Sequence, residues 1–125
     1  MKRVVVTGMA GFSPIGLDWE TTAANLKALK TGIAVMEEWN IYEGLNTRLG
    51  GPVPEFTLPP HYTRKKTRSM GRVSLMSTRV TELALEQAGL LDDPIISDGR
   101  MGVAYGSSTG TPQAVASRVT IAHGS

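Results

Sequence analysis

The chain opens with the sequence MKRVVVTGMAGFSPIG, residues 1–16. Val4, Val5 and Val6 form a β-branched run, and Gly8 follows it after a single threonine. Such a run, bounded by glycine, is typical of a strand buried on both faces of a layered α/β protein. We therefore predict a buried strand here. Several enzyme classes begin with such a strand, so the turn that follows must distinguish between them.

The glycine spacing of this turn does not fit a dinucleotide-binding site. Gly8, Gly11 and Gly16 do not follow the Gly-x-Gly-x-x-Gly pattern that lets bare backbone approach a pyrophosphate. The short-chain dehydrogenase variant would require glycines where this chain has Phe12 and Pro14. Neither residue permits the close approach, and proline also lacks an amide donor. Nucleotide binding by this turn is therefore excluded.

Residues 3–16 instead resemble the opening of the β-ketoacyl-acyl-carrier-protein synthases, the decarboxylating condensing enzymes of fatty-acid and polyketide synthesis. Thr7 and Gly8 match the Thr-Gly of that family, and SPIG at residues 13–16 matches its Ser-Pro-x-Gly turn. Ala10 stands where a second glycine is common. The resemblance implies an α/β architecture, the thiolase-like layered α/β/α/β/α fold. Residues 1–125 would be an incomplete N-terminal portion of a ketosynthase domain, the first part of its N-terminal half.

Length and composition are those of a globular domain, with 125 residues and 41% hydrophobic side chains. The end of the sequence at Ser125 has no stop signal beyond Gly124, so we expect a piece of a longer chain. No secretory segment and no apolar run of membrane-spanning length is visible. We expect a soluble, cytoplasmic protein that binds neither membranes nor nucleic acid.

The chain contains no cysteine. In the condensing enzymes a cysteine accepts the acyl chain as a thioester, and paired histidines polarise the malonyl thioester. Both lie downstream of the region that this sequence resembles, so the resemblance implies no catalytic residue here and an inactive chain when isolated. An alternative is a partner subunit of the chain-length-factor type, which lacks the cysteine. The implied partners are a phosphopantetheinylated acyl carrier protein and a second ketosynthase subunit, in a homodimer or heterodimer, with no cofactor.

Local signals predict the remaining elements. Asp18 is expected to cap a helix that runs to Lys30, with Trp19, Ala23 and Leu26 facing the core. A short strand is expected near residues 47–53. Residues 63–89 are predicted to form two helical pieces joined near Gly71, the second amphipathic and ended by an alanine and a glycine. A second buried strand is predicted at residues 100–105 and a closing helix at residues 112–123.

A basic cluster lies at the start of the predicted helical pair. It comprises Arg64, Lys65, Lys66, Arg68 and Arg72. In a continuous helix Arg64, Arg68 and Arg72 would stack at four-residue spacing. A solvated helix face is one interpretation, and nucleic-acid binding is disfavoured because no aromatic residues interleave with the charges. The stretch also reproduces the Arg-Lys-x-x-Arg-x-Met of the condensing enzymes, which implies carrier-protein docking by Lys65 and Arg68 first, and by Arg64.

The sequence GSSTG at residues 106–110 has two interpretations. Taken literally it is the Gly-x-Ser-x-Gly elbow of an α/β-hydrolase, but no Asp or Glu follows Thr109 and the only later histidine is His123. The resemblance implies instead a loop that borders the acyl pocket. Ser108 then replaces a glycine, and Thr109 occupies the variable position where side-chain size influences acyl-chain length. The sequence of this loop is therefore also compatible with an enzyme of polyene or polyketide synthesis.

His61 and His123 are predicted to lie at the surface, and no residue spacing indicates a metal site. A non-enzymatic binding module is the remaining alternative, and it predicts a stable monomer. An incomplete ketosynthase instead predicts exposed apolar surface and poor solubility.

Overall fold

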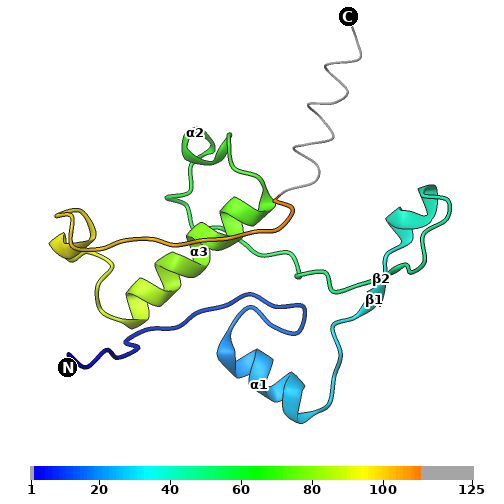
Figure 1. Ribbon diagram of the computed structural model, residues 1–125, viewed down its shortest axis with the longest axis horizontal. Helices are drawn as coiled ribbons and strands as arrows, with labels where there is room; N and C mark the ends of the chain where they lie inside the picture. Colours follow the sequence, from blue (N-terminus) through cyan, green and yellow to red (C-terminus); the bar gives the residue numbers. More distant parts are fainter. Residues whose placement is uncertain (1, 111–125) are drawn as a thin grey trace, which may run out of the picture. The chain divides into compact units, whose positions relative to one another are not determined.

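The computed structural model describes residues 2–110. The described chain divides into two compact units, one of residues 10–57 and the other of residues 2–9 together with 58–110. Figure 1 shows their elements in sequence colours. The helix predicted at residues 112–123, which includes His123, lies outside the described residues.

The unit of residues 10–57 begins with a tight turn. The amide of Ser13 donates to the carbonyl of Gly16 at 2.9 Å, and the amide of Gly16 donates back at 3.2 Å. The side-chain amide of Asn25 donates to the carbonyl of Ile15 at 2.6 Å. The Ser-Pro-Ile-Gly motif is therefore a closed turn that is fastened to the helix after it.

That helix is α1 (Trp19–Lys27), and it begins as predicted. Asp18 is its N-cap, and a carboxylate oxygen of Asp18 accepts the amide of Thr21 at 2.7 Å. The helix ends at Lys27, three residues earlier than predicted, because Leu29 adopts a left-handed conformation with φ of 54°. This conformation cannot continue a right-handed helix.

The remainder of this unit is a short antiparallel pair. Strand β1 (Ala34–Val35) pairs with β2 (Leu49–Gly50), in the register Ala34 to Gly50 and Val35 to Leu49. A 3-10 helix, η1 (Glu37–Ile41), lies in the connection between the strands. β2 confirms the short strand predicted near residues 47–53.

The second unit contains α2 (Arg64–Thr67), α3 (Arg72–Gln87) and the 3-10 helix η2 (Pro94–Ile96). The predicted division at Gly71 is confirmed, because Gly71 is the extended N-cap of α3. Ala88 is the C-cap of α3 and Gly89 follows it with φ of 70°. A positive φ just after a helix is the position that glycine occupies most readily.

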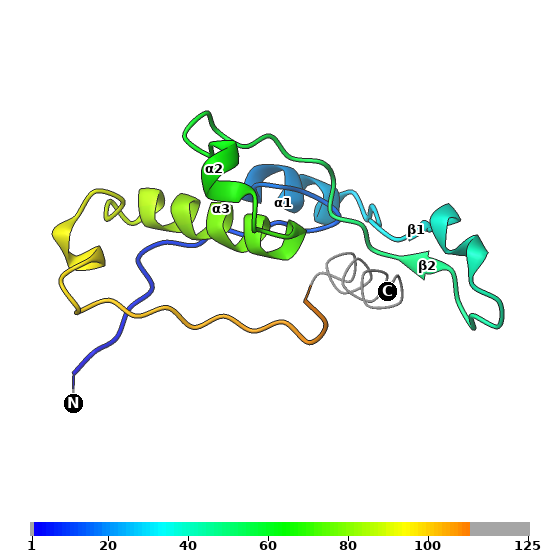
Figure 2. The same ribbon diagram turned by 90° about the horizontal axis from the view of Figure 1, so that it is seen from above.

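The segment of residues 2–9 packs against α3. A Cβ atom placed on Gly8 would lie 2.2 Å from the carbonyl oxygen of Ala84 and 3.0 Å from the Cβ of Ala88. The amide of Met9 donates to the side-chain oxygen of Gln87 at 2.5 Å. Figures 1 and 2 both show this dark-blue segment passing the C-terminal part of α3.

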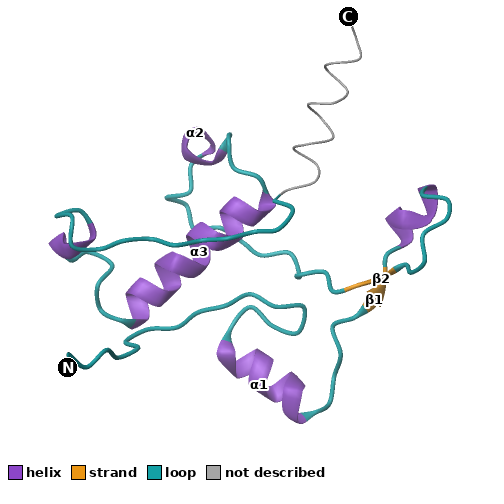
Figure 3. Ribbon diagram, viewed as in Figure 1, coloured by secondary structure: helices purple, strands orange, loops and turns teal. Residues whose placement is uncertain are grey.

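The two predicted buried strands are not formed. Residues 4–6 and 100–105 are extended loops, drawn in teal in Figure 3, and Val4 and Val103 are 91% and 74% exposed. A strand needs a neighbouring backbone to accept and donate its hydrogen bonds. Within residues 2–110, β1 and β2 form the only paired strands, so these two apolar segments have no sheet neighbour.

The predicted core face of α1 is also wrong for the described part of the chain. Trp19 and Leu26 are 76% and 53% exposed, and no apolar side chain of residues 2–110 is fully buried. An apolar stripe is buried only where another layer covers it. The expectation of exposed apolar surface is therefore met. No helix among residues 2–110 has both the length and the apolar character needed to cross a membrane.

Candidate functional site

The predicted carrier-docking residues lie on and beside α2. Arg64 and Lys65 belong to the helix, and Arg68 is its C-cap, with its amide donating to the carbonyl of Arg64 at 2.9 Å. We call the exposed residues Arg64, Lys65, Lys66 and Arg68 the basic patch. No acidic residue among residues 2–110 forms an ion pair with any of them.

The predicted stacking of Arg72 on Arg64 and Arg68 is wrong. Residues 68–71 interrupt the helix, and Arg72 is the first residue of α3. The four-residue spacing holds only within one continuous helix. The structure therefore groups Arg64 with Arg68 and leaves Arg72 on a different element.

An open groove of about 760 Å³ lies between α2, α3 and the extended residues 101–107. Its apolar lining includes Met70, Val73, Leu85, Leu91, Ile96 and Val103. Lys66 of the basic patch lines it too. The groove thus joins an apolar surface to the edge of a cationic one.

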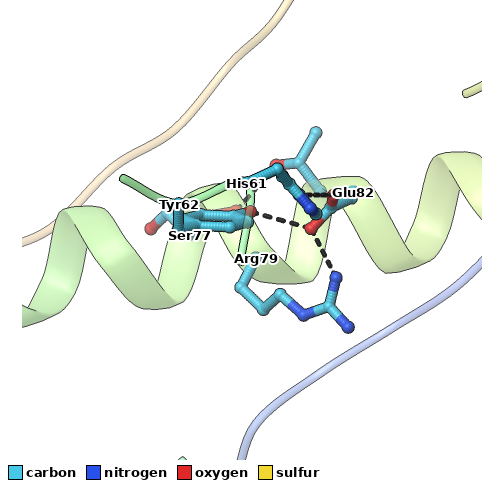
Figure 4. A network of polar contacts seen from close by, with 6 residues as sticks. His61, Tyr62, Ser77, Arg79 and Glu82 are labelled. Atoms are coloured by element: carbon cyan, nitrogen blue, oxygen red, sulfur yellow. Dashed lines mark hydrogen bonds and ion pairs between the residues drawn. The ribbon is translucent and has the colours of Figure 1, made fainter. Parts of the chain in front are cut away.

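A cluster of polar side chains occupies one part of this groove, and Figure 4 shows it. Glu82 of α3 is at its centre, with its side chain 15% exposed. The hydroxyl of Tyr62 donates to Oε2 of Glu82 at 2.9 Å, and the guanidinium of Arg79 donates to the same oxygen. Nε2 of His61 contacts Oε1. One carboxylate therefore holds three partners from two segments of the chain.

These contacts change the acidity of both central groups. Partial desolvation raises the pKa of Glu82, but the hydrogen bonds from Arg79, Tyr62 and His61 outweigh it and hold this pKa below its usual value. Desolvation and the hydrogen bond to Glu82 raise the pKa of Tyr62 to about 12. At neutral pH Glu82 is therefore ionised and accepts hydrogen bonds, whereas Tyr62 is protonated and donates one.

Tyr105 fastens the extended segment to α3. Its hydroxyl donates to the carbonyl of Ser77 at 3.1 Å and also contacts Oγ1 of Thr81. Gly106 and Ser107 follow and still line the groove. Residues 101–107 are thus held along the helix, as Figures 1 and 2 show.

The predicted acyl-pocket residues, Ser108 and Thr109, lie just beyond this segment. Both are exposed in a bend, and the amide of Gly110 donates to Oγ of Ser107 at 3.0 Å. The groove lining includes neither Ser108 nor Thr109. The structure therefore does not bring them together with the basic patch. No cluster of three or more His, Asp or Glu residues within residues 2–110 could hold a metal ion.

Residues 1–123 match the family model for the "Beta-ketoacyl synthase, N-terminal domain". The chain belongs to the beta-ketoacyl synthase family. This assignment confirms the resemblance drawn from residues 3–16.

Curated relatives of the chain are 3-oxoacyl-[acyl-carrier-protein] synthases. It is 33% identical over 111 residues to a 3-oxoacyl-[acyl-carrier-protein] synthase 1 of Haemophilus influenzae, covering 89% of this chain and 27% of the relative. It is 31% identical over 121 residues to a synthase 1 of Buchnera aphidicola, covering 97% and 30% of the two chains. The chain thus spans less than a third of the length of either relative.

A solved structure gives the fold. The chain matches a beta-ketoacyl synthase from Burkholderia phymatum with a TM-score of 0.89 and 49% identity, over 100% of this chain and 31% of that chain. The chain therefore has the thiolase-like α/β fold predicted for it, and it spans less than a third of that solved protein.

The sequence does not predict the Glu82 cluster as a whole. His61 was correctly placed at the surface, but its contact with Glu82 was not foreseen. Arg79 and Glu82 are three residues apart on a helix, a spacing that predicts an ion pair. Tyr62 lies 20 residues from Glu82 in the sequence, and no local pattern predicts that contact.

Proposed function

We propose that the protein containing this chain is a 3-oxoacyl-[acyl-carrier-protein] synthase that works in fatty-acid, polyene or polyketide synthesis. The observation that carries the proposal is the 49% identity to a beta-ketoacyl synthase over the full length of this chain. Because the chain spans 31% of that protein, the activity is proposed for the complete protein. The chain in isolation is proposed to be inactive, since it has no cysteine.

The proposed reaction is a decarboxylative Claisen condensation. A cysteine thiolate outside this chain attacks an acyl thioester, and the carrier thiol leaves. Malonyl-carrier then loses carbon dioxide, and the electron pair of the broken C–C bond forms a carbanion. The carbanion attacks the cysteine thioester, so that a new C–C bond forms and the thiolate leaves. Histidines outside this chain are proposed to polarise the malonyl thioester.

The basic patch is proposed to dock the carrier protein. Its side chains are exposed, and among the described residues none has an acidic partner. Uncompensated cations on a surface attract an acidic partner and accelerate encounter more than they tighten the final complex. Lys65 and Arg68 are proposed as the main contacts and Arg64 as a further one.

The loop of residues 106–110 is proposed to border the acyl pocket, with Thr109 limiting the chain that enters. The apolar groove beside the preceding residues supports this assignment, because Val103, Gly106 and Ser107 line it. A threonine narrows such an entrance by its branched Cβ. Ser108 is proposed as a neighbour of the pocket wall.

The test is a condensation assay with the product of the complete reading frame. Purified protein is incubated with an acyl-carrier and a malonyl-carrier labelled at the free carboxyl, and the isolated 125-residue chain serves as the control. We expect labelled carbon dioxide and 3-oxoacyl-carrier in equal amounts from the complete protein alone. Turnover only after addition of a cysteine-containing ketosynthase would identify a chain-length-factor-type subunit of a heterodimer. No turnover in either case overturns the proposal.

A further inference from the structure

We propose that Glu82 is a positioning residue for carrier-protein docking: through Tyr62 and His61 it fixes the segment that enters α2 and so sets the direction of the basic patch. This inference rests on the docking role proposed above. It assigns Glu82 no contact with substrate and no part in the chemistry.

The helix α2 is too short to fix its own direction. It has four residues, and its N-cap Thr63 makes no side-chain capping bond. A single helical turn has little stability of its own because nucleation fixes several residues for one hydrogen bond. The direction of α2 must therefore be set by the segments that flank it.

The segment that enters α2 is tied to α3 through Glu82. His61 and Tyr62 directly precede Thr63, and both contact the carboxylate of Glu82. The amide of Tyr62 also donates to the carbonyl of Pro59 at 3.0 Å, which closes a turn just before the helix. Glu82 belongs to α3, which has 16 residues and is therefore more rigid than the four-residue α2.

Glu82 positions α2 without neutralising the charge of the basic patch. Glu82 is the only acidic residue between residues 56 and 85, but its carboxylate is occupied by Tyr62, His61 and Arg79 and its side chain is mostly buried. The cations of the basic patch form no ion pair with it. Removal of the Tyr62 hydroxyl would therefore alter the placement of α2 and leave the charge of the patch unchanged.

The experiment compares two substrates in the complete synthase. One is an acyl-carrier protein, which must dock, and the other is the same acyl group on pantetheine. Malonyl-pantetheine is the second substrate in both assays, so that the pantetheine assay contains no carrier protein. The variants are Tyr62→Phe, Glu82→Gln and Glu82→Leu. Tyr42→Phe, an exposed tyrosine of the other unit, is the matched control for loss of a hydroxyl.

We expect Tyr62→Phe and Glu82→Leu to raise the KM for the acyl-carrier about three- to tenfold, the loss expected for one hydrogen bond. Glu82→Gln should show a smaller rise, because an amide oxygen still accepts from Tyr62. The KM and kcat for acyl-pantetheine should change less than about twofold, as should all values for Tyr42→Phe. An equal loss with both substrates would indicate a merely structural role and overturns the inference. Tyr62→Phe keeps the test valid if Glu82→Leu does not fold.

A second comparison separates this inference from the docking proposal. If Lys65→Glu plus Arg68→Glu leaves the KM for the acyl-carrier unchanged, the docking proposal itself is wrong. If that charge reversal raises the KM and Tyr62→Phe does not, only the positioning role is wrong. Because Glu82 acts through the basic patch, Tyr62→Phe should not raise the KM for the acyl-carrier any further when Lys65→Glu and Arg68→Glu are already present. Additive effects there would contradict the positioning role.

Discussion

Gly8 lies against the backbone of α3 at Ala84, so closely that a Cβ on Gly8 would come within 2.2 Å of the Ala84 carbonyl oxygen. This contact joins the first apolar segment of the chain to its longest helix. It also gives the Thr-Gly of the opening motif a structural reason. The glycine is required for close approach of two backbones, not for a phosphate.

Gly8→Ala is therefore expected to destabilise the complete protein by about 1–3 kcal/mol, the usual cost of overpacking. The obstacle is a backbone carbonyl, which cannot move aside as a flexible side chain does. Urea unfolding monitored by fluorescence measures the change. Gly11→Ala is the matched control, because no atom lies within 4 Å of a Cβ at that position, and it should change stability by less than about 0.5 kcal/mol. Equal effects of the two substitutions would contradict the packing described here.

Lys65→Glu plus Arg68→Glu in the complete synthase is expected to weaken carrier binding at least about tenfold at low salt. The difference should shrink as ionic strength rises from about 0.01 M to 0.15 M, because the Debye length falls from about 30 Å to about 8 Å. Titration of fluorescently labelled carrier protein measures the affinity. Lys30→Glu plus Arg48→Glu makes the same charge change at exposed positions of the other unit and should leave the affinity within about twofold. Unchanged affinity of the first variant at low salt would exclude docking at the patch.

Thr109→Ala is expected to shift the preferred acyl substrate of the complete synthase toward longer chains. Burial of one more methylene is worth about 0.8 kcal/mol, or about a fourfold gain in kcat/KM per added carbon. A competition assay with acyl-carriers of graded length measures the ratio. Thr111→Ala, two residues further along the sequence, is the control. An unchanged length profile for Thr109→Ala would remove this residue from the pocket wall.

The Glu82 cluster is expected to make stability depend on pH in the acid range. The pKa of Glu82 in the folded protein lies below its ordinary value of 4.5, so unfolding favours uptake of a proton. The stabilisation is complete above about pH 5 and is lost as the pH falls through the lowered pKa. In Glu82→Gln this part of the pH dependence should vanish, and in Tyr62→Phe it should weaken. Urea midpoints measured from pH 6 to pH 3 test this, and identical slopes in all three proteins would contradict it.

Local signals in the sequence predict the three α-helices α1, α2 and α3, but not the 3-10 helices η1 and η2. The glycine at Gly71 separates α2 from α3, and Ala88 with Gly89 ends α3, because each feature depends on neighbours a few residues away. Asp18 was recognised as a cap for the same reason. The helix α1 was predicted too long because nothing in the sequence around Leu29 indicates its left-handed conformation.

Long-range relationships could not be predicted in this way. The valines of residues 4–6 have the composition of a strand, but composition does not say which backbone will pair with them, and none does within residues 2–110. Likewise, Tyr62 meets Glu82 only because the chain turns back on α3. The family resemblance predicts the fold class, whereas the Glu82 cluster depends on a long-range contact that only the three-dimensional structure shows.

The bond between the amide of Met9 and the side chain of Gln87 spans 78 residues. Ribosomes add about 5–20 residues per second, so the opening segment is made several seconds before the helix that receives it. During synthesis Val4, Val5 and Val6 are exposed to solvent. Contacts across so long a loop form slowly, because the entropy cost of closing the loop precedes any stabilising contact. Residues 2–9 are thus synthesised before α3, and Gly8 can pack against that helix only after Ala84 and Ala88 have been made.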